Sequence, residues 1–457
     1  MPARPALHFA SPQELGSKEF REHYGAMYAY VAGAMYKGVA SVSLVTRMGQ
    51  AGMLSFFGTG GLDLAEIEDA IRLIQQALSA AQPYGMNLLH HPGNHAFEHA
   101  TVDLFLQHGV RNIEASAFMS MTPALVKYRL QGLRTDASGA VTAANRIIGK
   151  ISRPEVGEAF LSPAPEGIVR QLLAQGMVTA EQAELSARIA MCDDLCAEAD
   201  SGGHTDGAVS TALIPAVVNL RDAVCQRYGY AKWPRIGAAG GIGTPEAIAA
   251  VLLLGADFVV TGSINQCTVE AGTSEPVKQM LQEMDIQDTE YAPAGDMFEL
   301  GAKVQVLKRG VFFPTRANKL YDLWRQFDSW EAIDEKQRRQ IEEKFFMRSF
   351  AAVYAETKDF YSRYQPAEID KAERNPKHKM ALVFRWYFIL ASRVAMSGDP
   401  QRRVDYQVHT GPALGAFNQW VKGTGLEDWR KRHVDEIAVL LMQHASELFK
   451  RRLGAAA

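Results

Sequence analysis

Short apolar runs alternate with longer segments of helical periodicity through the first 265 residues. We predict eight buried strands, each bounded by glycine, proline or polar residues. They lie at 28–35, 52–57, 84–89, 110–115, 146–151, 194–199, 235–239 and 258–261. Between them, apolar residues spaced three and four apart predict helices, as in the segment 62–80. Eight strands alternating with helices over about 240 residues predict an α/β fold, a closed (β/α)8 TIM barrel, with a doubly wound open sheet as the alternative.

Two glycine-rich loops follow the last two predicted strands. Gly240 and Gly241 come after the seventh strand, and Gly262 and Ser263 come after the eighth. Neighbouring loops of this kind offer backbone amides to one phosphate, and this is the usual phosphate site of such barrels. No G-x-G-x-x-G follows the first strand, so a mononucleotide such as FMN suits the pattern better than a dinucleotide. The alternative is a plain crossover in which the glycines only form turns.

The character of the chain changes after residue 297. A short strand-like piece at 303–307 precedes aromatic, basic segments with helical spacing. These segments lie at 317–327, 335–354, 358–364, 378–396, 413–421 and 429–452. The expected domains are a leader over 1–20, the barrel over 21–297 and an added C-terminal helical substrate or lid domain over 298–430. A terminal helix is expected over 431–457, and its packing against the barrel is left open.

Composition and charge limit the classes of function. The chain has 457 residues, 47% of them hydrophobic and 22% charged, with a net charge of −3, which is ordinary for a soluble enzyme and argues against nucleic-acid binding. No apolar run reaches membrane-spanning length, and the N-terminus lacks the apolar core of a signal peptide. Four cysteines in so long a chain indicate a reducing, cytoplasmic setting.

Metal binding is not expected. Cys192 and Cys196 are four residues apart, but no second pair of ligands lies nearby in the sequence. His90, His91 and His95 have a suitable spacing, but no cluster of acids accompanies them. One of the first two histidines is expected to reach a pocket and the other to cap a turn.

Polar residues at the ends of the predicted strands are the candidates for chemistry, because catalytic groups in a barrel lie at the carboxyl ends of strands. Five ends stand out, namely Gly33-Ala34-Met35, Asn87 with His90 and His91, Glu114, Lys150 and the segment 198–204. The last, EADSGGH, is the most specific, because its glycines permit close approach to a planar ring and His204 can give or hold a proton. Lys150 fits an anion or flavin-edge ligand. For Glu114 a solvated strand end is the alternative, and for His204 a solvent-facing turn.

The motifs DSGGH at 200–204, GAAGGI at 237–242 and VTGS at 260–263 resemble the FMN-dependent barrel enzymes, which include nitronate monooxygenases and flavin-type bacterial enoyl-ACP reductases. A closer resemblance covers nearly the whole chain. It is carried by EADSGGHTDG, GAKVQVLKRGVFFPTRANKLYDLW, RNPKHKMALVFRWYF, SGDPQRR and GPALGAFNQWVKG. On these motifs the chain is identified as a member of the PfaD-type, stand-alone, trans-acting enoyl reductases of polyunsaturated-fatty-acid synthases and trans-acyltransferase polyketide synthases. Ser201, where simpler relatives usually have alanine, disfavours a nitronate substrate.

The resemblance implies that NADPH, through FMN, reduces the 2,3-double bond of an enoyl thioester on an acyl carrier protein. It implies His204 as the catalytic residue, either as proton donor or as the group that polarises the thioester carbonyl, with water as the alternative donor. It implies that FMN is bound by Gly33, Ala34, Met35 and Asn87 at the flavin edge, by Lys150, by Gly202 and Gly203 against the ring, and by Ala239, Gly240, Gly241, Gly262 and Ser263 at the phosphate.

Carrier proteins are commonly acidic, so a basic docking surface is expected in the helical domain. The available clusters are Arg338-Arg339, Lys377 with Lys379, and Arg402-Arg403. The aromatic residues of that domain either line an acyl tunnel or, for the greater part, form its core. The sequence does not determine the oligomeric state, and a homodimer is one of the alternatives. The rival functions are a nitronate monooxygenase-like flavin oxidase and a non-catalytic scaffold that binds carrier proteins.

Overall fold

The computed structural model describes residues 11–91, 93–203 and 206–453. The described chain forms two compact units. The first contains the residues up to Ser201, those from 206 to Gly272, and those from Ala416 onward; the second contains Gly202, Gly203 and the residues from Thr273 to Gly415. The units therefore change at 272–273 and 415–416, whereas the sequence placed its domain boundaries at 297 and 430.

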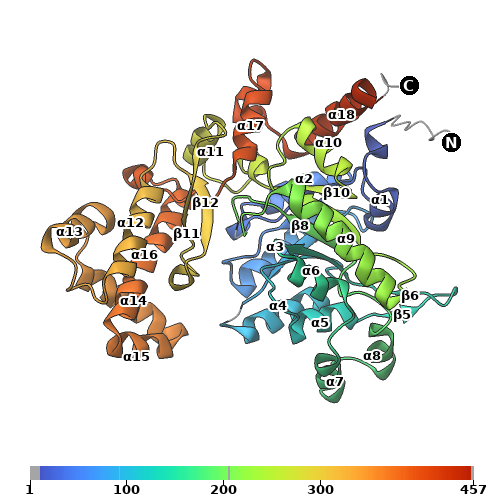
Figure 1. The fold of residues 1–457 in the computed structure, drawn as a ribbon, viewed down its shortest axis with the longest axis horizontal. Coiled ribbons are helices and arrows are strands. Elements are labelled where there is room, and N and C mark those ends of the chain that lie inside the picture. The colour runs from blue at the N-terminus through green and yellow to red at the C-terminus, as the bar shows by residue number, and fades with distance from the viewer. Residues whose placement is uncertain (1–10, 92, 204–205, 454–457) are drawn as a thin grey trace. The chain divides into compact units, whose positions relative to one another are not determined.

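A closed barrel of eight parallel strands lies at the centre of the first unit (Figure 1). The strands are β1 Tyr30–Ala32, β2 Leu54–Phe57, β3 Gly85–Leu89, β4 Asn112–Ser116, β7 Arg146–Ile151, β8 Asp194–Glu198, β9 Arg235–Ala239 and β10 Phe258–Thr261. Neighbours pair in the order β1-β10-β9-β8-β7-β4-β3-β2. The barrel closes where β1 pairs with both β10 and β2. The predicted (β/α)8 fold is confirmed, and the open sheet is excluded.

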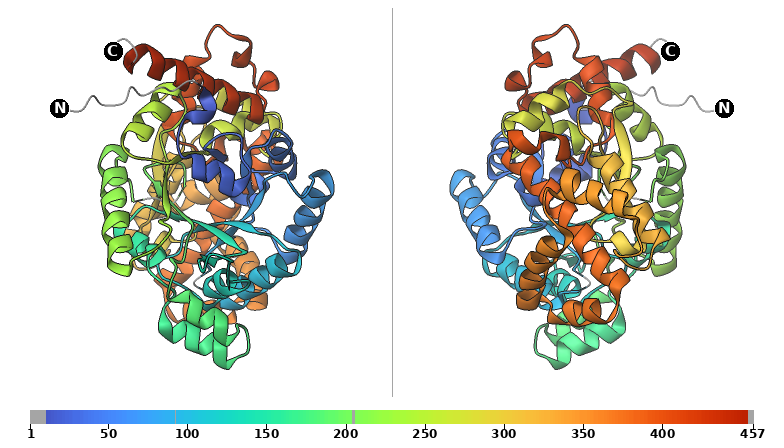
Figure 2. Two further views of the ribbon diagram at one scale, coloured as in Figure 1. Left: turned by 90° about the vertical axis from the view of Figure 1, so that its right-hand side faces the viewer. Right: turned by 90° about the vertical axis from the view of Figure 1, so that its left-hand side faces the viewer.

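Helices lie around the outside of these strands, as the blue to green ribbons show (Figure 2). They are α1 Lys18–Tyr24, α2 Val42–Gln50, α3 Leu64–Ala77, α4 His95–Gln107, α5 Pro123–Leu130, α6 Pro154–Leu161, α7 Glu166–Ala174, α8 Ala180–Ser186, α9 Ser210–Tyr228 and α10 Pro245–Leu253. Side chains cap many of their first turns; Asp63, Thr122 and Thr244 each accept a backbone N–H at the start of a helix. A hairpin of β5 Arg134–Thr135 and β6 Val141–Thr142 follows α5.

Helix α1 contributes to the core at the amino end of the barrel. Phe20 stacks on Phe258 with ring centroids 4.3 Å apart, and Tyr24 joins the same cluster. Gly237 must be glycine, because a Cβ there would lie 2.3 Å from the ring of Phe258. Part of the segment that the sequence assigned to a leader therefore belongs to the core, since Leu15 and Phe20 are fully buried.

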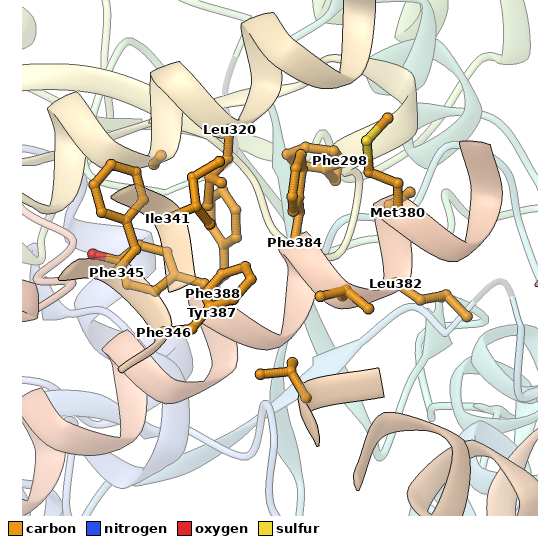
Figure 3. Packing of buried hydrophobic residues seen from close by; sticks show 14 of the residues in the cluster. Phe298, Leu320, Ile341, Phe345, Phe346, Met380, Leu382, Phe384, Tyr387 and Phe388 are labelled. Atoms are coloured by element: carbon orange, nitrogen blue, oxygen red, sulfur yellow. The ribbon is translucent and has the colours of Figure 1, made fainter. Parts of the chain in front are cut away.

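The second unit combines a two-stranded antiparallel sheet with helices around an aromatic core. The sheet consists of β11 Thr289–Pro293 and β12 Lys303–Leu307, the latter at its predicted position. The helices are α11 Glu275–Gln282, α12 Phe313–Gln326, α13 Glu335–Gln340, α14 Phe350–Tyr364, α15 Pro366–Arg374 and α16 Pro376–Ser397. Figure 3 shows Phe345, Phe346, Phe384, Tyr387 and Phe388 packed together, and all five are buried. These aromatic side chains form a core, as the second of the two interpretations expected.

Two sequence-based expectations for this unit need correction. The helix expected over 335–354 is interrupted, because a π-helical turn, η5 Ile341–Phe346, follows α13 and Met347 adopts a left-handed conformation with φ 57°. A new helix then starts after the Ser349 cap. Helix α16 is also long and apolar enough, by length and composition, to cross a membrane, contrary to the expectation from the sequence. Its apolar window is 56% buried inside the protein, which is typical of a core helix.

The chain ends on the first unit. Helix α17 Pro412–Trp420 is followed by the short turns η7 Gly425–Glu427 and η8 Trp429–Lys431, and then by α18 Val434–Leu453. Helix α18 packs against α10, α2 and the short turn η1 Pro12–Glu14.

Candidate active site

A lysine lies between two carboxylates toward the carboxyl ends of three neighbouring strands. Lys150 on β7 has its Nζ 3.3 Å from Oε1 of Glu114 on β4 and 3.1 Å from Oε1 of Glu198 on β8. The side chains of Glu114, Lys150 and Glu198 are 2%, 13% and 20% exposed. Two carboxylates therefore share one ammonium group, and the cluster carries an excess negative charge when all three groups are ionised.

Burial and charge act together on the pKa values of this cluster. Burial raises the pKa of Glu114 above its usual value, and the charge of Lys150 opposes that rise. Burial alone would lower the pKa of Lys150, but Glu198 and Glu114 outweigh it and raise the pKa above its usual value. Lys150 is therefore a permanent cation at neutral pH and is not suited to donate a proton.

Glu114 also fixes the end of β1. Its Oε2 accepts the backbone N–H of Ala34 at 2.7 Å, and the N–H of Gly33 donates to the carbonyl of Thr261 at 2.9 Å. A Cβ at Gly33 would lie 2.8 Å from Val260 Cγ1, so the close approach there requires glycine. The alternative of a solvated Glu114 is wrong, because the side chain is buried and joins β1 to β7.

Asn87 on β3 forms hydrogen bonds to the neighbouring strand β4, which carries Glu114. Its Nδ2 donates to the backbone carbonyl of Glu114 at 2.8 Å and lies 3.0 Å from Ser116 Oγ. The backbone carbonyl of Asn87 accepts from Thr59 Oγ1 at 2.8 Å. Thr59 and Ser116 were not among the predicted site residues. Their only signal in the sequence is their position at the ends of the second and fourth strands.

The two glycine-rich loops lie side by side, because β9 and β10 are paired neighbours and Phe258 is opposite Gly237. Gly240 has φ 87°, and a Cβ there would lie 2.4 Å from the carbonyl oxygen of Ala199, so only glycine fits. At Gly241 and Gly262 a Cβ would meet nothing within 4 Å, so open space adjoins the backbone of both loops. Ser263 opens the short turn η3 Ser263–Cys267, and Ala239 is the buried last residue of β9.

The loop after β8 is described only in part. Ser201 Oγ donates to Glu198 Oε1 at 3.4 Å. A Cβ at Gly202 would lie 2.9 Å from the backbone of Thr410, so the close approach that glycine permits here is to another part of the second unit. The predicted catalytic residue, His204, lies outside the described residues, and the roles proposed for Gly202 and Gly203 against a ring stay predictions.

The histidines after β3 are held by a buried glutamate of α4. His90 Nδ1 is 2.9 Å from Glu98 Oε2, and the backbone N–H of His91 donates to the same oxygen. Burial lowers the pKa of the His91 imidazole. Within the described parts of the chain, no group of three or more histidine, cysteine, aspartate or glutamate side chains gathers as a metal site, and the four cysteines are buried without forming a disulfide.

Comparison with known proteins shows which family the chain resembles. Residues 327–406 match the family model described as "[Acyl-carrier-protein] S-malonyltransferase, inserted helical domain". The polyketide biosynthesis protein PksE of Bacillus subtilis is 56% identical over 96% of this chain, and one component of a polyunsaturated fatty acid synthase from a Thraustochytrium species is 47% identical over 91%. The chain spans only 57% and 28% of the lengths of these two relatives.

A solved structure matches almost end to end. The enoyl reductase domain of MlnA, from the macrolactin biosynthesis cluster of Bacillus amyloliquefaciens, superimposes with a TM-score of 0.94 at 49% identity, covering 97% of this chain and 99% of that domain. This agreement extends through the barrel and the helical unit alike. The chain therefore belongs to the enoyl reductase family of polyketide and polyunsaturated fatty acid synthases.

Proposed function

We propose that this chain is an FMN-dependent enoyl reductase that uses NADPH to reduce the 2,3-double bond of an enoyl thioester, presented in trans by an acyl carrier protein. One observation carries the proposal: a partly buried lysine, kept cationic by Glu114 and Glu198, lies at the end of the barrel that also holds two glycine loops with open space beside them. Membership of the enoyl reductase family supports the reaction class.

The residues present fit a flavin mononucleotide. Open space adjoins the backbone of Gly241 and Gly262, with Gly240 and Ser263 next to them, and a phosphate would bind to the backbone amides there. The start of α10, which Thr244 caps, adds the favourable helix dipole. Lys150 would bond the ring, and Gly33, Ala34 and Met35, held through Glu114, would line its edge. When bound, FMN would supply two-electron transfer between the nicotinamide and the enoyl thioester.

The chain's own residues would supply position and charge. Lys150 would place a fixed positive charge beside the flavin ring, and a preorganised charge of this kind would lower the barrier without reorganisation. Because Lys150 stays protonated, it is not the proton source for the α-carbon. We propose His204 for that step or for polarising the thioester carbonyl, with water as the other donor.

The basic residues of the expected docking clusters differ in whether they already contact other side chains of the protein. Lys377 pairs with Asp328, and Lys379 lies 4.1 Å from the centre of the Tyr354 ring. Arg402 pairs with the buried Asp405, whereas Arg403 is exposed. We propose that Arg403 contributes to carrier-protein binding. We also propose a cytoplasmic location, which fits four buried cysteines that form no disulfide within the described chain.

An anaerobic experiment tests the function. The purified protein is loaded with FMN, mixed with NADPH while the visible flavin band is followed, and then given crotonyl thioester. Loss of the band with NADPH and its return with the thioester are the expected results. Loss without return would identify another acceptor, and oxygen consumption with a nitronate, without NADPH, would identify a flavin oxidase. A folded protein that retains no flavin would overturn the enzyme assignment.

A further inference from the structure

The loop that follows β10 is hydrogen-bonded to a segment near the C-terminus. We call residues 262–270 the phosphate-side loop and residues 426–436 the brace; both belong to the first unit. The N–H of Val269 donates to the carbonyl of Arg432 at 2.9 Å. His433 Nδ1 is 2.5 Å from Glu270 Oε1, and the N–H of Val434 donates to Glu270 Oε2 at 3.2 Å. Side-chain and backbone contacts therefore fix the end of the loop to the brace.

Arg432 is the central side chain of the brace and is fully buried. Its Nε donates to the carbonyl of Leu426 at 2.6 Å and its Nη2 to that of Glu427 at 3.3 Å. Its Nη1 lies 3.3 Å from Cys267 Sγ, on the phosphate-side loop itself. Among the residues that the structure describes, no carboxylate forms an ion pair with this guanidinium. The charges of Glu427 and Asp428 act on it only at longer range. A buried positive charge without an ion pair is costly, so a nearby anion would be stabilising.

Hydrogen bonds link the residues between Gly262 and Cys267. Asn265, which is fully buried, donates its N–H to the carbonyl of Gly262 at 2.9 Å and its Nδ2 to the carbonyl of Thr261 at 3.0 Å. Thr268 Oγ1 donates to the carbonyl of Asn265 at 2.7 Å. The loop is thus a hydrogen-bonded unit with glycine amides at one end and the Arg432 contact at the other.

The same C-terminal part of the chain supports the other glycine loop. Helix α18, which begins at Val434 within the brace, packs along α10, and α10 starts just after Gly240 and Gly241. The C-terminal part of the chain therefore contacts the loop after β10 and also α10, the helix that follows the loop after β9.

We propose that Arg432 is a positioning residue for the phosphate group of the flavin. It holds the phosphate-side loop in place through Cys267 and Val269, and its buried charge, which forms no ion pair among the described residues, favours a phosphate at the amides of Gly262 and Ser263. This inference rests on the proposed function, since it assumes that FMN binds at these loops.

The test compares two flavins that differ only in the phosphate. Dissociation constants of FMN and riboflavin are measured by flavin fluorescence for the wild type, R432M and R432Q. We expect FMN binding to weaken about tenfold in both variants, the scale of one partly screened charge, while riboflavin binding changes less than about twofold. R316M is the matched control, because Arg316 is a largely buried arginine of the second unit that already pairs with Asp405; its FMN affinity should equal that of the wild type.

The outcomes separate the two hypotheses. If the wild type binds no FMN, the proposed function fails. If it binds FMN but R432M and R432Q weaken FMN and riboflavin equally, or neither, the proposal for Arg432 is overturned while the function stands. R432Q retains a donor for a carbonyl of the brace, so it decides the question if R432M does not fold; circular dichroism identifies the folded variants.

Discussion

The two ends of the barrel both contain buried ions, but they are built differently. At the amino end, Arg235 binds Asp194 with two hydrogen bonds, Nε to Oδ1 at 2.6 Å and Nη2 to Oδ2 at 2.8 Å, and the Tyr24 hydroxyl donates to Oδ2 at 2.7 Å. At the carboxyl end, Lys150 makes one contact to each of two carboxylates at 3.1 and 3.3 Å. The first arrangement matches one cation with one anion, whereas the second leaves an excess carboxylate.

The difference separates stability from chemistry. A bidentate pair whose two charges match without a ligand holds strands together, and removing one partner leaves a buried charge uncompensated. Lys150 makes a single contact to each carboxylate and is partly exposed, so it keeps a hydrogen-bond donor for a ligand. The two carboxylates maintain its positive charge. This division follows the general rule that the amino face of such barrels supports the fold and the carboxyl face performs the chemistry.

The largest effect should come from breaking the amino-end pair. R235M leaves Asp194 buried without its partner and should lower the free energy of unfolding by about 3–5 kcal/mol. Urea denaturation measures this loss. The FMN dissociation constant of the folded fraction should stay within about twofold of the wild type. A large loss of flavin affinity at unchanged stability would contradict the division between the two ends.

The next effect concerns the carboxyl end. K150M removes the fixed charge and should slow flavin reduction by NADPH about a hundredfold, the scale for losing one preorganised donor. Stopped-flow absorbance measures the rate. The double variant K150M/E198Q relieves the repulsion between the remaining carboxylates, so it should recover stability but not rate. Recovery of the rate as well would show that Lys150 acts only on the fold.

A third prediction uses acid. Burial lowers the pKa of His23 in α1 from its usual 6.5 to about 3, against the opposing charge of Asp193. A lowered pKa means that the stabilising contribution is complete above pH 6.5 and is lost as the pH falls toward 3. Wild-type stability should therefore fall by on the order of 1 kcal/mol per pH unit in this window, and H23Q should flatten the profile. Parallel profiles for both proteins would contradict the assignment.

The smallest effect is expected from Glu114. Burial raises its pKa above the usual 4.5, so its contribution is complete below pH 4.5 and is lost as the pH rises through the higher folded value. E114Q keeps an acceptor for the Ala34 N–H but cannot titrate. Relative to this variant, the wild type should lose stability as the pH rises from 4.5 toward neutrality, as followed by urea denaturation. The opposite slope would mean that Lys150 controls the pKa of Glu114.

The sequence predicted the elements that have a clear local pattern and missed the elements and contacts that lack one. The strands at 146–151, 235–239 and 258–261 have their predicted bounds, because each is a buried apolar run closed by a polar or glycine-rich end. Helix α9 was not predicted, since it contains Pro215 and its apolar residues do not gather into one stripe.

The site followed the same rule. Glu114, Lys150 and the segment from Glu198 were recognised by their positions at strand ends, but the contacts of Lys150 with Glu114 and Glu198 depend on the register of β4, β7 and β8. Arg432 gave no signal at all, because its partner Cys267 lies 165 residues earlier in the chain.

The most direct test of the proposed flavin site is a crystal structure of the protein with FMN. We predict the phosphate within hydrogen-bond distance of the amides of Gly240, Gly241, Gly262 and Ser263, and the ring in contact with Lys150. Flavin density away from the carboxyl end of the barrel, or a phosphate remote from both glycine loops, would contradict this site.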